Sequence, residues 1–241
     1  MQINIQFLRA IAALMVVFYH VDGHSYAAGG AFSSFFFNYV TQFGYAGVDM
    51  FFVISGYIMW RTTRKVATGK HVIKFAYSRA TRIYLGYWPY FLLLLLMVYL
   101  TNPAEIARLD LVDSFFLTST AVNELLLPVS WTLTFELYFY LCFTILLFAV
   151  NKERLPYVLG FLFILIITVQ IWARFFVGVY QGNFDEFYYL YTFFVSSYCL
   201  EFIAGCFVAI FFESRRVKRI SWLAGGAFFS PRRRPAPAPP R

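Results

Sequence analysis

The chain alternates long apolar runs with short polar segments. Six runs have the length of helices, and they lie near residues 3–21, 44–60, 83–101, 130–150, 156–176 and 190–212. A helix of about 20 apolar residues crosses the hydrocarbon core of a bilayer, and the first two runs are short by this measure. The pattern predicts an all-α fold, a polytopic transmembrane helix bundle.

Composition supports this prediction and changes how the charge is interpreted. The sequence is 61% hydrophobic and only 13% charged, which is too apolar for a soluble domain. Its net charge of +8 comes from basic residues in connecting segments, so it indicates topology and contact with membrane lipid rather than nucleic-acid binding. The three cysteines lie in apolar runs without the spacing of metal ligands, so we expect buried free thiols and no metal site.

Loop charge predicts the orientation of the bundle. Segment 61–82 carries seven Lys or Arg and no acidic residue, and four more basic residues lie in 215–219. Segment 102–129 carries four acidic residues against Arg108 alone. Positive loops stay in the cytoplasm, so six spans place the N-terminus there and segment 102–129 outside. That outer segment is either an amphipathic element or a plain loop.

The last residues have a different composition. Apolar sequence stops at Phe229, and a Pro- and Arg-rich stretch follows over 230–241. Such sequence is disordered or extended, as in a cytoplasmic tail, or it results from a frameshift. We favour a C-terminal truncation, because residues 220–229 resemble the start of another span. The expected domain is therefore 1–229, incomplete at its C-terminal end.

The first apolar run contains two ionisable residues, Arg9 and His20. Eleven positions separate them, which is close to three helical turns, so both side chains share one face about 16 Å apart. Ionisable groups are costly inside a membrane helix and usually mark a functional path. With the N-terminus in the cytoplasm, Arg9 lies towards the cytoplasm and His20 towards the outer face. As an alternative, His20 is only a polar cap at the interface.

Two carboxylates are predicted at a depth similar to that of His20. Asp49 and Glu136 both fall in the outer halves of inward-running spans. A carboxylate beside an imidazole fixes its tautomer and raises its basicity, which suits a general base. The alternatives are that Asp49 caps its helix and that Glu136 belongs to a buried ion pair.

Arginines gather at the predicted cytoplasmic end. Arg9, Arg79 and Arg82 carry the planar guanidinium groups that bind phosphates well. Without other support, Arg79 and Arg82 are ordinary residues of a positive-inside loop. Ser55 lacks the setting of a catalytic serine, and we interpret it as a helix-packing residue.

Five stretches resemble the membrane acyltransferase 3 family, in the family's order. They are residues 7–20 with the Arg9 to His20 spacing, 47–57, the RxxR element 79–84, the Trp/Glu block 130–140, and 201–206. Each is weak alone and the ordered set is specific. The sequence around Trp131 and Glu136 resembles that of the exopolysaccharide-modifying branch of the family. Members of the family have about ten helices, of which this chain supplies about six.

The resemblance implies an O-acyltransferase of the bacterial cytoplasmic membrane. The co-substrate is expected to be acyl-CoA, most often acetyl-CoA, and the acceptor a sugar hydroxyl of a polysaccharide or glycolipid. No bound cofactor is expected. In this hypothesis Arg79 and Arg82 bind the CoA phosphates, Arg9 lines the approach and Trp131 joins the substrate-binding residues. His20 takes the proton of the acceptor hydroxyl, and Asp49 or Glu136 orients it. An acyl-histidine relay is an alternative route.

Two other classes of protein fit the same residues. A transporter or flippase of a lipid-linked glycan has ionisable residues along its path, as Arg9, His20 and Glu136 do here. An inactive truncated fragment is the third interpretation. An acyltransferase releases CoA from the acyl-CoA thioester, whereas a transporter or flippase does not.

Overall fold

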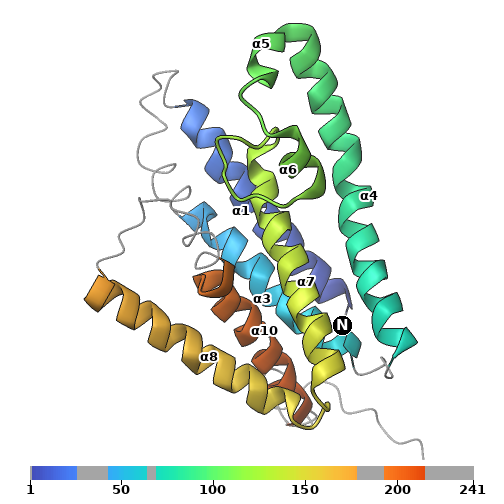
Figure 1. Ribbon diagram of the computed structural model, residues 1–241, viewed down its shortest axis with the longest axis vertical. Coiled ribbons are helices and arrows are strands. Elements are labelled where there is room, and N and C mark those ends of the chain that lie inside the picture. Colours follow the sequence, from blue (N-terminus) through green and yellow to red (C-terminus); the bar gives the residue numbers. More distant parts are fainter. Residues whose placement is uncertain (1, 26–42, 64–68, 178–192, 215–241) are drawn as a thin grey trace, which may run out of the picture.

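The computed structural model describes residues 2–25, 43–63, 69–177 and 193–214. It contains six long helices and no strand in this part of the chain (Figure 1). The helices are α1 (Gln2–Ser25), α3 (Ala46–Thr63), α4 (Lys70–Thr101), α7 (Trp131–Ala149), α8 (Leu155–Trp172) and α10 (Ser197–Ser214). The prediction of an all-α bundle is confirmed. The predicted tail 230–241 and the basic cluster in 215–219 lie outside the described residues.

Three helices are long and apolar enough to cross a membrane. They cover Lys70–Thr101, Pro128–Ala149 and Leu155–Phe175, and α1 adds a shorter apolar stretch, Asn4–His20. Their outer faces carry large apolar side chains, such as Leu85, Tyr157 and Phe161, that are at least 65% exposed. Apolar surface this extensive is unfavourable in water and favourable in lipid. The arrangement is that of a membrane bundle.

The third helix begins earlier than the sequence predicts. We expected a span from residue 83, but α4 starts at Lys70, after Gly69 with a φ of +68°. Its first three turns bury Val72 on one side and leave Lys70 and Lys74 exposed, so these lysines, Arg79 and Arg82 belong to a helix and not to a loop. As a result, Arg79 and Arg82 have fixed directions within the bundle.

Segment 102–129 is an ordered element rather than a plain loop. It contains α5 (Pro103–Ile106) and α6 (Leu111–Phe116), and Asp110 caps α6 by accepting a hydrogen bond from the Asp113 N–H. Tyr87 of α4 donates a 2.7 Å hydrogen bond to the Ser114 carbonyl, which ties α6 to the bundle. The segment therefore forms one wall beside α4.

Close contact between α3 and α10 organises the centre. A Cβ on Gly56 would meet the Phe202 carbonyl oxygen at 1.9 Å, and a Cβ on Gly205 would meet the Val53 carbonyl oxygen at 2.0 Å. Small residues let two membrane helices approach in this way. The two helices run parallel, because Tyr45 pairs with Tyr198 at one end and Trp60 with Glu213 at the other. Parallel directions are expected for the second and sixth spans.

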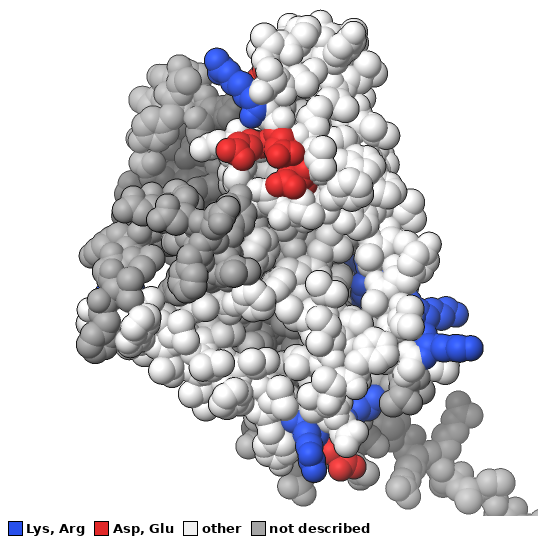
Figure 2. Space-filling view, viewed as in Figure 1, with Lys and Arg blue, Asp and Glu red and all other residues white. Residues whose placement is uncertain are grey.

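Charged side chains separate towards opposite ends of the molecule. In Figure 2 the acidic side chains gather mainly near α6, and most of the visible basic side chains lie towards the other end. This separation agrees with the loop charges from which we predicted the orientation.

Candidate functional site

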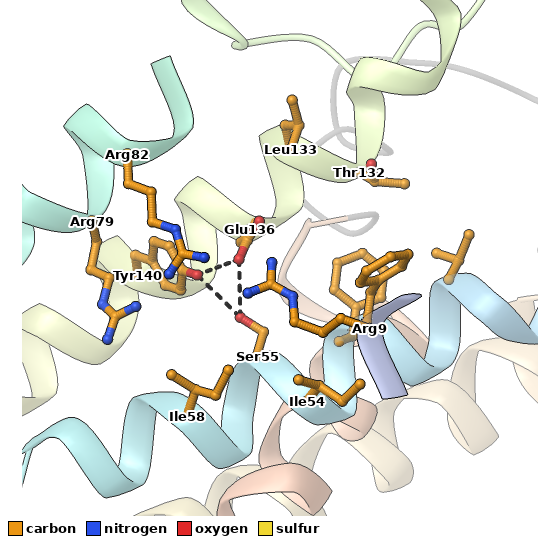
Figure 3. A pocket seen from close by; sticks show the side chains of 13 residues that line it. Arg9, Ile54, Ser55, Ile58, Arg79, Arg82, Thr132, Leu133, Glu136 and Tyr140 are labelled. Atoms are coloured by element: carbon orange, nitrogen blue, oxygen red, sulfur yellow. Dashed lines mark hydrogen bonds between the residues drawn. The ribbon is translucent and has the colours of Figure 1, made fainter. Parts of the chain in front are cut away.

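Four helices enclose a cavity of about 240 Å³ at the centre of the bundle (Figure 3). α1, α3, α4 and α7 each contribute to its lining. Most of the lining is apolar. The polar side chains that point into it include Arg9, Ser55, Arg79, Arg82, Glu136 and Tyr140. We call this cavity the arginine pocket.

The three predicted arginines converge in this pocket. Arg79 and Arg82 are three residues apart, so they share one face of α4, and Arg9 reaches in from α1. Arg79 donates a 3.1 Å hydrogen bond to the Thr62 hydroxyl. Its guanidinium also lies 5.4 Å from the Phe75 ring centroid, a cation–π distance. The side chain of Arg79 is therefore held in place before any ligand arrives.

Glu136 is held by a small hydrogen-bond network. Ser55 donates to a Glu136 carboxylate oxygen at 3.3 Å and lies 3.3 Å from the Tyr140 hydroxyl. Tyr140, one turn after Glu136 on α7, donates to the same carboxylate oxygen. The network joins α3 to α7 and directs the carboxylate into the pocket (Figure 3).

The pocket has an excess of positive charge. Three guanidinium groups face one carboxylate among apolar walls. Charges interact more strongly in such surroundings than in water, because the effective dielectric constant is lower. A dianionic group such as a phosphate matches this excess, and guanidinium groups bind phosphate oxygens in pairs.

A second cavity of about 260 Å³ continues from the first. It shares five lining residues with the arginine pocket: Arg9, Arg82, Leu133, Glu136 and Tyr140. Its other lining residues are Ile83, Gly86, Tyr87 and Tyr90 of α4, together with Leu127. We call this second cavity the α4 lobe.

His20 lies in a different part of the bundle. Its side chain is exposed and meets the Tyr19 ring edge-on, with 5.3 Å between the ring centroids. Tyr19 contacts the Tyr45 ring at 6.2 Å, and the Tyr45 hydroxyl bonds to that of Tyr198. Trp131 in turn lies 5.3 Å from the Tyr198 ring. His20 and Trp131 are thus linked through an aromatic cluster near the start of α3, α7 and α10.

The two predicted carboxylates separate in the structure. Asp49 is half-buried, one turn after Tyr45, and so belongs with the aromatic cluster. Glu136 lines the arginine pocket together with Arg9. His20 lies about three helical turns further along α1 than Arg9. The hypothesis that Glu136 orients His20 stays a prediction, and the structure shows Glu136 in the lining of the arginine pocket. Glu136 is five residues, about 7 Å, inside the start of α7, and the Arg9 side chain points towards it from α1 (Figure 3).

Sequence reasoning missed two residues of the pocket. Tyr140 had a detectable signal, because a spacing of four residues puts it on the same helix face as Glu136. Ser55 had no detectable signal in the sequence, because its partner Glu136 on α7 is 81 residues away along the chain. The interpretation of Ser55 as a packing residue omitted its bond to Glu136. All three cysteines are free thiols. Cys199 and Cys206 are buried, as predicted, whereas Cys142 is only partly buried.

Comparison with known proteins gives the family. The sequence matches the acyltransferase domain family, acyltransferase 3, over residues 2–229. The chain belongs to this family. The predicted resemblance is confirmed, and the arginine pocket and the His20 cluster are parts of an acyltransferase 3 bundle.

One relative acts in exopolysaccharide production. The chain is 33% identical over 199 residues to the exopolysaccharide production protein ExoZ of Rhizobium meliloti (strain 1021). The match covers 78% of this chain and 56% of the relative, so the chain spans little more than half the length of that protein. No solved structure matches the chain.

Proposed function

We propose that the protein transfers an acyl group, most simply acetyl, from acyl-CoA to a hydroxyl of an exopolysaccharide or cell-surface sugar. The observation that carries this proposal is the convergence of Arg9, Arg79 and Arg82 in one cavity. Acyl-CoA is an apolar-tipped molecule with three phosphate groups at its other end. An acyltransferase with an excess of positive charge in a central pocket is suited to hold those phosphates.

The chemical step is assigned to the His20 end. A neutral sugar hydroxyl is a weak nucleophile, so a base must remove its proton during attack. His20 is exposed and accepts that proton while the sugar oxygen bonds to the thioester carbonyl carbon. The carbon–sulfur bond then breaks, and the proton passes to the departing CoA thiolate. The acyl group ends as an ester on the sugar.

Asp49 is the better candidate for orienting His20. It lies one turn from Tyr45, whose ring contacts Tyr19 next to His20, whereas Glu136 faces the arginines. A carboxylate near the imidazole stabilises its protonated form as the transition state develops. Glu136 is thereby available for a role in donor binding.

The loop charges support a reaction across the bacterial cytoplasmic membrane. The Lys70 end of α4 and the N-terminus face the cytoplasm, where acyl-CoA is made, and the acidic α6 end faces outwards. The donor therefore binds from the inside, and the acceptor sugar meets His20 towards the outside.

The test is acyl transfer in membranes that contain the protein. Membranes are given acetyl-CoA labelled in its acetyl group, and both labelled carbohydrate and released CoA thiol are measured. We expect both products from the wild type, neither from His20→Ala, and wild-type amounts from His71→Ala, since His71 is an exposed histidine at the other end of the bundle.

Each result has a definite meaning. Absence of thiol release from the wild type contradicts acyl transfer and favours a transporter. Wild-type acetylation by a normally expressed His20→Ala variant contradicts the proposed role of His20 but leaves acyl transfer by the protein standing.

A further inference from the structure

The α4 lobe continues the arginine pocket in one direction only, along α4. Arg82, Gly86 and Tyr90 are spaced by four residues, so they share one face of the helix. The rise from Arg82 to Tyr90 is about 12 Å, because each helical residue contributes about 1.5 Å. α1 and α4 both run from the basic end of the bundle to the acidic end. The lobe thus covers most of the rise of about 16 Å that separates Arg9 from His20 on α1.

The lining of the lobe differs from that of the pocket. Beyond the shared residues it has no charged side chain and consists of Ile83, Gly86, Tyr87, Tyr90 and Leu127. The Tyr87 hydroxyl is bound to the Ser114 carbonyl at 2.7 Å, so this wall is fixed against α6. The lobe therefore accepts an uncharged, extended group that is attached to an anionic one.

Gly86 contributes no side chain to the α4 lobe. A Cβ added at this position meets no heavy atom within 4 Å, whereas at Gly44, Gly47, Gly56 and Gly205 it meets backbone or side-chain atoms at 2.6 Å or less. The other four glycines are required by helix packing. No neighbouring helix requires Gly86, which lies on an exposed side of the lobe, and its missing side chain leaves the lobe open there.

A carboxylate at the junction of the two cavities also needs an explanation. Glu136 lines both of them, yet it repels the phosphates that the arginines attract. A carboxylate accepts hydrogen bonds from amide N–H and hydroxyl groups. The arm of acyl-CoA between the phosphates and the sulfur is uncharged and carries two amides and a hydroxyl.

We propose that the α4 lobe holds the uncharged pantetheine arm of the acyl donor, that Gly86 sets the width of this passage, and that Glu136 accepts a hydrogen bond from the arm. This inference rests on the proposed function and specifies the path of its donor. The arm leaves the phosphates at Arg82 and extends along α4 towards the level of His20.

The test compares two probes on purified full-length protein in detergent. CoA has the phosphates and the arm, whereas adenosine 3′,5′-bisphosphate has phosphates but no arm. In Gly86→Leu the new side chain occupies the lobe, and we expect the Kd for CoA to weaken by about tenfold or more. The Kd of the bisphosphate should change by less than about twofold. Gly86→Ala, with a smaller side chain, should have a smaller effect on CoA.

The matched control is Leu85→Phe. Leu85 is the adjacent residue of α4, 70% exposed and outside both cavities, so added bulk there should leave both affinities unchanged. Unchanged CoA binding in Gly86→Leu overturns the proposal, and so does an equal loss of both probes. If the wild type binds neither probe, the proposed donor itself is wrong, a result that differs from either of these.

Discussion

Ser55 on α3 donates a 3.3 Å hydrogen bond to Glu136 on α7, and Tyr140 donates to the same carboxylate oxygen. These two donors hold a negative charge in place within a pocket that also contains Arg9, Arg79 and Arg82. A carboxylate without them is able to turn towards a guanidinium and form an ion pair. The network therefore keeps the arginines available for an anionic ligand.

Tyr140→Phe should weaken donor binding. The substitution removes one of the two hydrogen bonds to Glu136, which is worth about 1.5–3 kcal/mol for a charged acceptor. The released carboxylate then competes with the donor phosphates for the arginines. We expect the Kd for CoA to rise by about tenfold or more.

Tyr138→Phe is the control for this change. Tyr138 is a half-buried tyrosine of the same helix that does not line the arginine pocket. Equal CoA affinities in the wild type and Tyr140→Phe, measured by the same titration, would show that the network does not serve the arginines.

The glycines between α3 and α10 should determine stability. In Gly56→Ala the new Cβ lies 1.9 Å from the Phe202 carbonyl oxygen, so the helices must separate. Overpacking of this kind costs about 1–3 kcal/mol. We expect a lower Tm in detergent for Gly56→Ala.

Gly160→Ala supplies the comparison. Its Cβ meets only a Phe207 ring atom, at the ordinary distance of 3.7 Å, and alanine favours a helix over glycine by about 1 kcal/mol. Its Tm should equal or exceed that of the wild type. A Gly56→Ala protein as stable as Gly160→Ala argues against the close α3–α10 contact.

The direction of α4 can be tested by cysteine labelling. Lys70 and Asn102 are exposed residues at opposite ends of this helix. In intact spheroplasts a membrane-impermeant maleimide should label Asn102→Cys and should label Lys70→Cys only after permeabilisation. The parent protein, with its own three cysteines, gives the background signal. Labelling in the reverse order contradicts the proposed orientation.

The sequence predicted helices and their charges better than it predicted which side chains share a cavity. Long apolar runs predict helices, a helix lies at each of the six predicted positions, and three of these helices are long and apolar enough to cross a membrane. Convergence of the arginines was also predictable, because loop charge places them at one end. The start of α4 was not predictable, because its first turns are basic and resemble a loop in sequence. That Glu136 lines the same cavity as the arginines was not predictable, because the direction of the long Arg9 side chain depends on tertiary packing.

The central claim is that the arginine pocket binds the phosphates of acyl-CoA, and equilibrium binding of CoA to Arg82→Ala tests it most directly. Loss of a guanidinium–phosphate contact of about 1.5–3 kcal/mol should raise the Kd for CoA by about tenfold or more, and added salt should weaken wild-type binding. Lys74→Ala, which removes an exposed basic residue of the same helix outside the pocket, should bind CoA as the wild type does. Equal affinities of the wild type and Arg82→Ala for CoA would contradict the account.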